Sequence, residues 1–124
     1  MAIVNNGVVA QITIAPGGGI GDPVPQPIST VPNAHIVFVI ANNDSQKHRV
    51  SIQPFEFKKK KNSDPDDPMD PFTNWWTDVE ANDVGSLVLH VKPSAHFPQG
   101  HKSEYKYTIH SSNSKLDPDV EINN

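Results

Sequence analysis

Twelve prolines and seven glycines are spread along this chain of 124 residues, and no stretch between them keeps a helical periodicity over three turns. Proline lacks a backbone N–H and disfavours the interior of a helix, while glycine adds conformational entropy to the unfolded chain. Several short runs between these interruptions instead alternate apolar and polar residues with a period of two, which is typical of strands. The chain is therefore expected to be all-β.

This alternation predicts about seven strands, which favour a Greek-key β-sandwich or barrel. The clearest runs are residues 8–14, 35–41, 48–53, 86–92, 104–110 and 119–122. In the fifth run, Tyr105, Tyr107 and Ile109 occupy the inward positions. Residues 35–41 are nearly all β-branched or aromatic, which indicates a central strand covered on both faces. Residues 48–53 are expected to pair with it as a hairpin.

The length suits one compact unit, so residues 1–124 are expected to form a single β-sandwich domain. Within it, residues 1–33 supply a strand followed by a Pro/Gly-rich arm, and residues 34–122 supply the core. The arm is longer than most structureless loops, so it is expected either to be mobile or to lie along an edge of the sandwich.

Residues 58–76 combine opposite charges with aromatic side chains, because four lysines and four aspartates precede the aromatic residues. One interpretation is a solvated loop in which the charges compensate each other. The other is a docking surface for a protein partner or a second copy of the chain. The candidate partner-binding residues are Lys58, Lys59, Lys60, Lys61, Phe72, Trp75 and Trp76. On a strand, one of the two adjacent tryptophans would face inward as an anchor and the other outward.

The absence of cysteine excludes disulfides, thiol nucleophiles and cysteine-ligated metal centres. The net charge is −4, and no basic half of the chain would attract nucleic acid. No apolar run approaches the ~18 residues of a membrane span, and no signal peptide begins the chain. We therefore expect a soluble chain that binds neither nucleic acid nor membrane. It would be cytoplasmic as it stands, or periplasmic or secreted if a signal peptide has been removed.

Six histidines are the only abundant metal ligands that are neutral near physiological pH. None of them forms an H-x-H or H-x-x-x-H pair, and solvated surface histidines remain one interpretation. The candidate metal ligands are His48, His90 and His110, of which His90 and His110 would come within cross-strand reach if their strands were neighbours. A Cu(II)- or Zn(II)-binding protein is therefore an alternative function.

No constellation for catalysis stands out. The chain has no G-x-S-x-G motif, and the glycines of residues 17–21 are followed by prolines rather than by the Lys-Ser/Thr and helix of a phosphate loop. The acidic residues 64–70 lack the glycine and the terminal glutamate of a calcium loop. We predict no catalytic residues and no cofactor, and a small hydrolase is the least favoured alternative.

A buried strand that ends in Asn42-Asn43-Asp44 is followed by His48, by an alternating strand and by Phe55. The run Tyr105-Lys106-Tyr107-Thr108-Ile109 stands near a short final strand. In this order of segments, residues 34–122 resemble the cupredoxin-like family. An immunoglobulin-like sandwich would satisfy the same alternation and is the alternative fold.

The resemblance implies a copper ligand set that this chain only begins to match. In blue-copper members of the family, the first ligand is a histidine placed as His48 is, and a cysteine follows at the position of Ile109. The histidine and methionine of the next loop have no counterpart in residues 111–115. Because a copper–thiolate bond needs a thiolate, the resemblance implies a copper-free member. The expected function is a non-catalytic binding, accessory or structural module.

Overall fold

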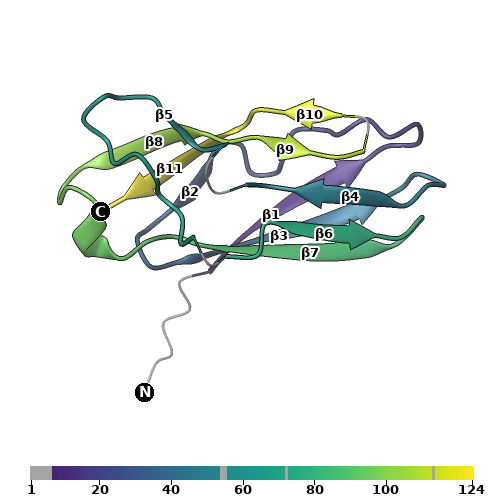
Figure 1. Cartoon of the computed structure of the whole chain (residues 1–124), viewed down its shortest axis with the longest axis horizontal. Coiled ribbons are helices and arrows are strands. Elements are labelled where there is room, and N and C mark those ends of the chain that lie inside the picture. The colour runs from purple at the N-terminus through teal and green to yellow at the C-terminus, as the bar shows by residue number, and fades with distance from the viewer. Residues whose placement is uncertain (1–6, 54–55, 72, 113) are drawn as a thin grey trace, which may run out of the picture.

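The structure is a computed structural model, and it describes residues 7–53, 56–71, 73–112 and 114–124. This part of the chain contains eleven strands, a 3-10 turn at Ser94–His96 and no α-helix (Figure 1). The strands are β1 (Gly7–Ile14), β2 (Ile28–Thr30), β3 (His35–Asn42), β4 (His48–Ser51), β5 (Lys58–Lys59), β6 (Trp76–Val79), β7 (Val84–His90), β8 (Lys102–Lys106), β9 (Ile109–His110), β10 (Lys115–Leu116) and β11 (Asp119–Asn123). The all-β prediction is confirmed. Within the described ranges, no helix is long and apolar enough to span a bilayer.

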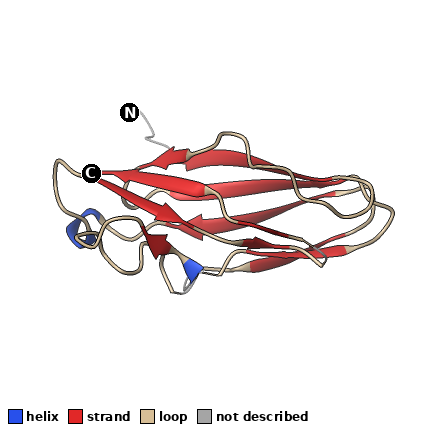
Figure 2. Ribbon diagram, turned by 90° about the horizontal axis from the view of Figure 1, so that it is seen from above, coloured by secondary structure: helices blue, strands red, loops and turns tan. Residues whose placement is uncertain are grey.

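Three hydrogen-bonded sheets organise these strands, in the orders β1-β3-β7, β10-β9-β4-β6 and β2-β11-β8-β5. β1 lies parallel to β3 and β11 lies parallel to β2, while the remaining pairs are antiparallel. Figure 2 shows the strands running along the long axis of the molecule, with connecting loops at both ends. The strand segments outnumber the seven that the sequence predicts because several contain only two or three residues.

The core consists of the alternate residues that face between the sheets. Tyr105, Tyr107 and Ile109 are all buried, as the period of two predicts. The ring of Tyr107 stacks on Phe57 at 5.4 Å between centroids and lies 5.9 Å from the ring of Phe38. Each large apolar side chain removed from water in this way contributes about 1.5–3 kcal/mol to the free energy of unfolding.

Two predictions about residues 35–53 are wrong. β3 pairs with β1 and β7, whereas β4 pairs with β6 and β9, so the two strands belong to different sheets and form no hairpin. Asn42, at the end of β3, connects the turn to β6. Its Nδ2 amide donates to the backbone oxygen of Gln46 in the turn at 2.8 Å and to that of Val79 in β6 at 3.1 Å. β3 is also covered on one face only, which leaves Val37 and Val39 partly exposed.

The Pro/Gly-rich arm lies along the edges of the sandwich. Gln11 and Val24 exchange two backbone hydrogen bonds of 2.9 Å, which attach the arm to β1. Further along, β2 pairs with β11. Of the two sequence interpretations, the structure therefore shows the extended edge arm.

The described residues of the segment 58–76 are mostly exposed, but the middle of the segment contains buried side chains. Met69 is fully buried, and only 4% of Asp64 is exposed. The Asp64 carboxylate lies 2.8 Å from the His101 Nε2 atom, and the Tyr105 hydroxyl donates to the Pro65 carbonyl at 2.7 Å. Buried contacts therefore fix the middle of this segment to β8, whereas residues 58–61 and Asp66 are exposed, as the solvated-loop interpretation expects.

The two core tyrosines differ in how their hydroxyl groups are satisfied, and this difference gives a first prediction. Burial raises the pKa of the Tyr107 phenol, whose oxygen has no hydrogen-bond partner among the described residues. Tyr107→Phe is therefore expected to leave the free energy of unfolding unchanged or to raise it. Tyr105→Phe loses the bond to Pro65 and should cost about 1 kcal/mol. Urea denaturation of both variants checks this, and an equal loss in the two would contradict it.

Candidate functional site

The position that the resemblance assigns to a first copper ligand is held by His48, at the start of β4. His48 is buried, and its Nε2 atom lies 2.7 Å from the Asp44 Oδ2 atom. The other carboxylate oxygen of Asp44 accepts hydrogen bonds from the backbone N–H groups of Gly17 at 3.1 Å and Ser45 at 2.9 Å. The hydrogen bond from His48, together with these, lowers the pKa of Asp44. The ionised carboxylate therefore stabilises the folded chain, and this contribution is lost as the pH falls below 3.8, the ordinary value.

This end of the molecule does not offer the donor set of a blue-copper centre. The His48 Nδ1 atom is buried and has no hydrogen-bond partner among the described residues. Ile109, at the position of the thiolate, is fully buried and supplies only a hydrocarbon side chain. The nearby hollow is lined by Gly17, residues 44–48 and Ser112, which add no second imidazole and no sulfur. One imidazole without a thiolate does not fit a blue-copper ion.

The three candidate metal ligands are not brought together. His48 lies beside Asp44, His110 lies beside Glu56 with 2.7 Å between Nε2 and Oε2, and His90 ends β7. The strands of His90 and His110 belong to different sheets, so the condition for their cross-strand contact is not met. The described ranges contain no cluster of three or more His, Asp or Glu side chains arranged to hold a metal ion.

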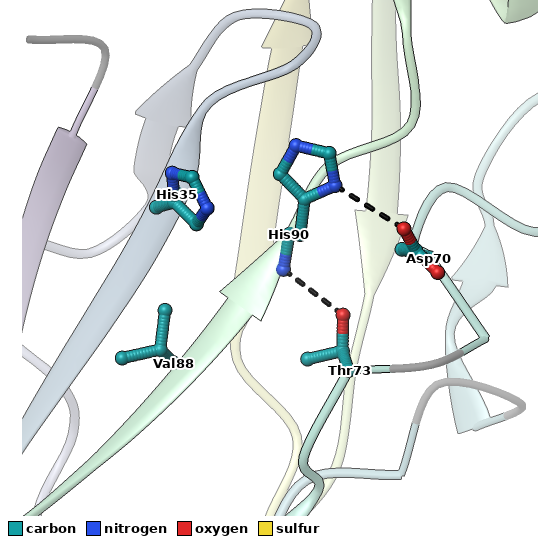
Figure 3. A pocket seen from close by; sticks show the side chains of 5 residues that line it. All are labelled: His35, Asp70, Thr73, Val88 and His90. Carbon is teal, nitrogen blue, oxygen red and sulfur yellow. Dashed lines mark hydrogen bonds and ion pairs between the residues drawn. The ribbon is translucent and has the colours of Figure 1, made fainter.

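His90 instead faces a histidine that the sequence reasoning did not select. His35 and His90 are directly opposite each other in the antiparallel pair of β3 and β7, and their ring centroids are 4.8 Å apart. Together with Asp70, Thr73 and Val88, they line a hollow (Figure 3). The sequence could not reveal this pair, because the register of two strands that are distant in the sequence depends on the whole sheet.

Three of the four candidate lysines form ion pairs with carboxylates of the same chain. Lys59 pairs with Asp66, Lys60 lies 3.5 Å from Asp119, and Lys61 lies 3.6 Å from Glu104. Lys58 and Lys59 form β5, at the edge of the sheet β2-β11-β8-β5. The proximity of opposite charges that the sequence predicts is present for Lys59 and Asp66.

Both tryptophans lie at the surface. Trp75 is 41% exposed and Trp76 is 43% exposed, so the prediction that one of them faces inward as an anchor is wrong. Trp75 precedes β6, so strand alternation does not apply to it, and Trp76 is an outward residue of this edge strand. Phe72, the third aromatic candidate, lies outside the described residues.

Trp76 is held in place by a charged neighbour. The Arg49 guanidinium lies 4.0 Å from the centroid of the Trp76 ring, within the range of a cation–π interaction. Asp78 fixes this guanidinium through two contacts, of 2.9 Å to Nε and 3.2 Å to the terminal nitrogen. Arg49 in turn lowers the pKa of the Asp78 carboxyl through these hydrogen bonds. The result is an ordered aromatic surface on the sheet that contains β4 and β6.

A second exposed apolar surface escaped the sequence reasoning. The outer face of the sheet β1-β3-β7 carries no Asp, Glu, Lys or Arg, and one row across its three strands consists of Val9, Val37 and Val88. Val9 is 60% exposed, and Val84 on the same face is 61% exposed. The signal in the sequence is the apolar character of both alternating sets of residues in β3, which also fits a strand buried on both faces.

No protein-family model matches this chain, and no curated protein matches it. Among solved structures, the McoA multicopper oxidase from the hyperthermophile Aquifex aeolicus is similar, with a TM-score of 0.50 and 14% identity. The match covers all of this chain and 31% of the oxidase. Fet3p, a multicopper oxidase that functions in iron import, matches with a TM-score of 0.40 and 8% identity, over 94% of this chain and 27% of its own.

Lac15 from a marine microbial metagenome matches with a TM-score of 0.39 and 14% identity, over 97% of this chain and 32% of its own. This chain therefore spans about a third of the length of these proteins. The likeness to McoA concerns the fold alone, and it supports the cupredoxin-like sandwich that the sequence predicts rather than the immunoglobulin-like alternative.

Proposed function

We propose that this chain is a non-catalytic, copper-free cupredoxin-like binding module that contacts a protein partner through Trp75 and Trp76. The observation that carries this proposal is the exposure of two adjacent tryptophans, one of which is ordered by Arg49. Tryptophan and arginine are enriched among the residues that dominate the affinity of protein interfaces. A preformed aromatic surface also loses little side-chain entropy when it binds.

The donor set supports the copper-free part of the proposal. The sequence contains no cysteine, and the buried Ile109 stands where the resembled family has its copper-binding cysteine. His48 matches the first copper ligand by position, and a single imidazole lacks the thiolate on which blue-copper electron transfer depends. The proposal therefore does not include electron transfer.

The lysines contribute less than the tryptophans in this proposal. Lys59, Lys60 and Lys61 are already paired with carboxylates of the same chain, and exposed ion pairs of this kind contribute only about 0–1 kcal/mol. Lys59 also lies in a different sheet from Trp76.

The proposal is tested by comparing Trp76→Ala with Val84→Ala in capture of partner proteins by the purified chain. Val84 is also an exposed apolar residue, but it lies on the sheet β1-β3-β7, so it is a matched control. We expect the wild type and Val84→Ala to retain the same partner, and Trp76→Ala to bind it at least about tenfold more weakly, which corresponds to ~1.4 kcal/mol.

Affinities are then measured by calorimetry with the captured protein, and sedimentation over a range of concentrations tests whether the partner is a second copy of the chain. Equal binding by all three proteins would place the contact elsewhere and would reject the tryptophan surface. Circular dichroism of Trp76→Ala is the control for folding, because a spectrum equal to that of the wild type would exclude unfolding as the cause of weaker binding.

A further inference from the structure

We propose that His35 and His90 form a site for one divalent transition-metal ion, Cu(II), Ni(II) or Zn(II), at the outer end of the sheet β1-β3-β7. The two residues are a cross-strand pair, with ring centroids 4.8 Å apart and ring planes inclined by 41°. Two imidazoles at this separation are close enough for one nitrogen of each to bind the same ion at about 2.0–2.1 Å. Figure 3 shows His90 between His35 and Asp70, and these three residues line a hollow together with Thr73 and Val88.

The partners of His90 provide the second argument. Its Nδ1 atom lies 3.4 Å from the Asp70 Oδ2 atom, and its Nε2 atom lies 2.9 Å from the Asn33 Oδ1 atom. Both neighbours are oxygen acceptors, whereas a neutral imidazole carries a single N–H. If Asp70 accepts that N–H, Nε2 is left with a lone pair beside the amide oxygen of Asn33. Two ligand atoms in adjacent coordination positions, each about 2.0–2.1 Å from an ion, are about 2.9 Å apart, so an ion beside this contact could bind both.

Asp70 then acts as a positioning residue rather than as a ligand. A carboxylate that accepts the N–H of a metal-binding histidine fixes the tautomer and the orientation of the ring, and it raises the basicity of the other nitrogen. The backbone N–H of His90 is also held, by the Thr73 Oγ1 atom at 3.2 Å. His35 is exposed, so solvent can deliver the ion to the pair.

The site has few protein ligands, and this sets its expected strength. The two imidazoles and the Asn33 oxygen leave the other coordination positions to water, and the described part of the chain holds no cluster of three His, Asp or Glu ligands. We therefore expect affinity in the micromolar range. Cu(II) should bind more tightly than Ni(II) or Zn(II), in the general order for nitrogen ligands.

This site is separate from the position at which the resemblance would place copper. His35 begins β3, whereas Asp44, the partner of His48, follows the end of the same strand. A strand of this length spans about 23 Å at ~3.3 Å per residue. Metal binding by His35 and His90 would therefore leave His48 unaffected, and it is independent of the proposed tryptophan surface.

The contacts of His90 also have an explanation without metal, which the test must distinguish. An N–H on Nε2 would donate to the Asn33 oxygen at 2.9 Å, and the longer contact of 3.4 Å to Asp70 would then add little. In that case the close approach of His35 reflects only the packing of two strand ends, and neither histidine has a role in binding metal.

Calorimetric titration of the full chain with each of the three metals at pH 7.5 tests the proposal, with His35→Ala, His90→Ala and His96→Ala as variants. His96 is exposed in the 3-10 turn, so His96→Ala is a control for a surface histidine outside the pair. We expect the wild type and His96→Ala to bind one equivalent, and each variant of the pair to bind at least about tenfold more weakly.

Nuclear magnetic resonance gives a second readout that does not depend on affinity. Substoichiometric Cu(II) should broaden the imidazole signals of His35 and His90 before those of His48 and His110. The proposal is overturned if the wild type binds none of the metals in the micromolar range. It is also overturned if His35→Ala binds as tightly as the wild type, or if the first signals to broaden belong to other histidines.

Discussion

Met69→Ala is expected to lower the free energy of unfolding by about 2–5 kcal/mol, the usual cost of truncating a buried methionine. Met69 is fully buried although prolines and aspartates surround it in the sequence. It forms a β-bridge with Val91, and the next residue along the chain, Asp70, donates its backbone N–H to the His90 carbonyl at 2.8 Å. Truncation would leave a cavity between the segment 58–76 and the end of β7.

Chemical denaturation compares this variant with Met69→Leu and Asn62→Ala. Leucine has nearly the volume of methionine and should cost less than about 1.5 kcal/mol. Asn62 is exposed in the same segment, so its replacement should stay within about 0.5 kcal/mol of the wild type. If Met69→Ala is as stable as Asn62→Ala, the segment is not docked as described.

Gly85→Ala is expected to destabilise the chain by about 1–3 kcal/mol, because the new methyl group has no room. A Cβ atom at Gly85 would lie 2.8 Å from the Cγ2 atom and 3.6 Å from the Cβ atom of Val79. Val79 is a buried β-branched residue of β6 and cannot move aside without disturbing the core. The two residues lie where β6 and β7, which belong to different sheets, meet at the turn that joins them.

A double-mutant cycle separates this clash from a general intolerance of β7. Val79→Ala removes the opposing methyl groups, so the double variant should lose less stability than the sum of the two single losses. Gly19→Ala is the control, because a Cβ atom at Gly19 would meet nothing within 4 Å. Strict additivity of Gly85→Ala and Val79→Ala would show that contact with Val79 is not the cause.

The sequence predicted the strands and the inward faces of several of them, but it did not predict which strands pair. The alternation around Tyr105 and Tyr107 is local, so it indicates burial directly. The partners of β3 depend on contacts across the whole fold, and proximity in the sequence wrongly suggested β4. An apolar run also cannot distinguish a strand covered on both faces from one with an exposed apolar face. Val37 and Val39 are therefore expected to be buried, whereas the structure leaves them partly exposed.

In the candidate sites, too, the sequence indicates what is local but not what depends on strand pairing. His48 could be selected from its place after the Asn-rich turn, and the tryptophans from their type. The His35–His90 pair requires the register of β3 and β7, which the local sequence does not contain. The burial of Met69 was hidden because a single apolar residue among prolines and charges has no periodicity to reveal it.

The position of β11 determines when the fold can be completed during synthesis. Residues 119–123 lie between β2 and β8, so the sheet β2-β11-β8-β5 has no centre until this segment has left the ribosome. The sheet β1-β3-β7 needs only residues up to 90 and can pair earlier. Until β11 arrives, the facing edges of β2 and β8 stay open to other nascent chains. Rapid pairing of β11 with β2 and β8 therefore protects the chain against aggregation, and its many non-local pairings indicate folding on the scale of milliseconds to seconds.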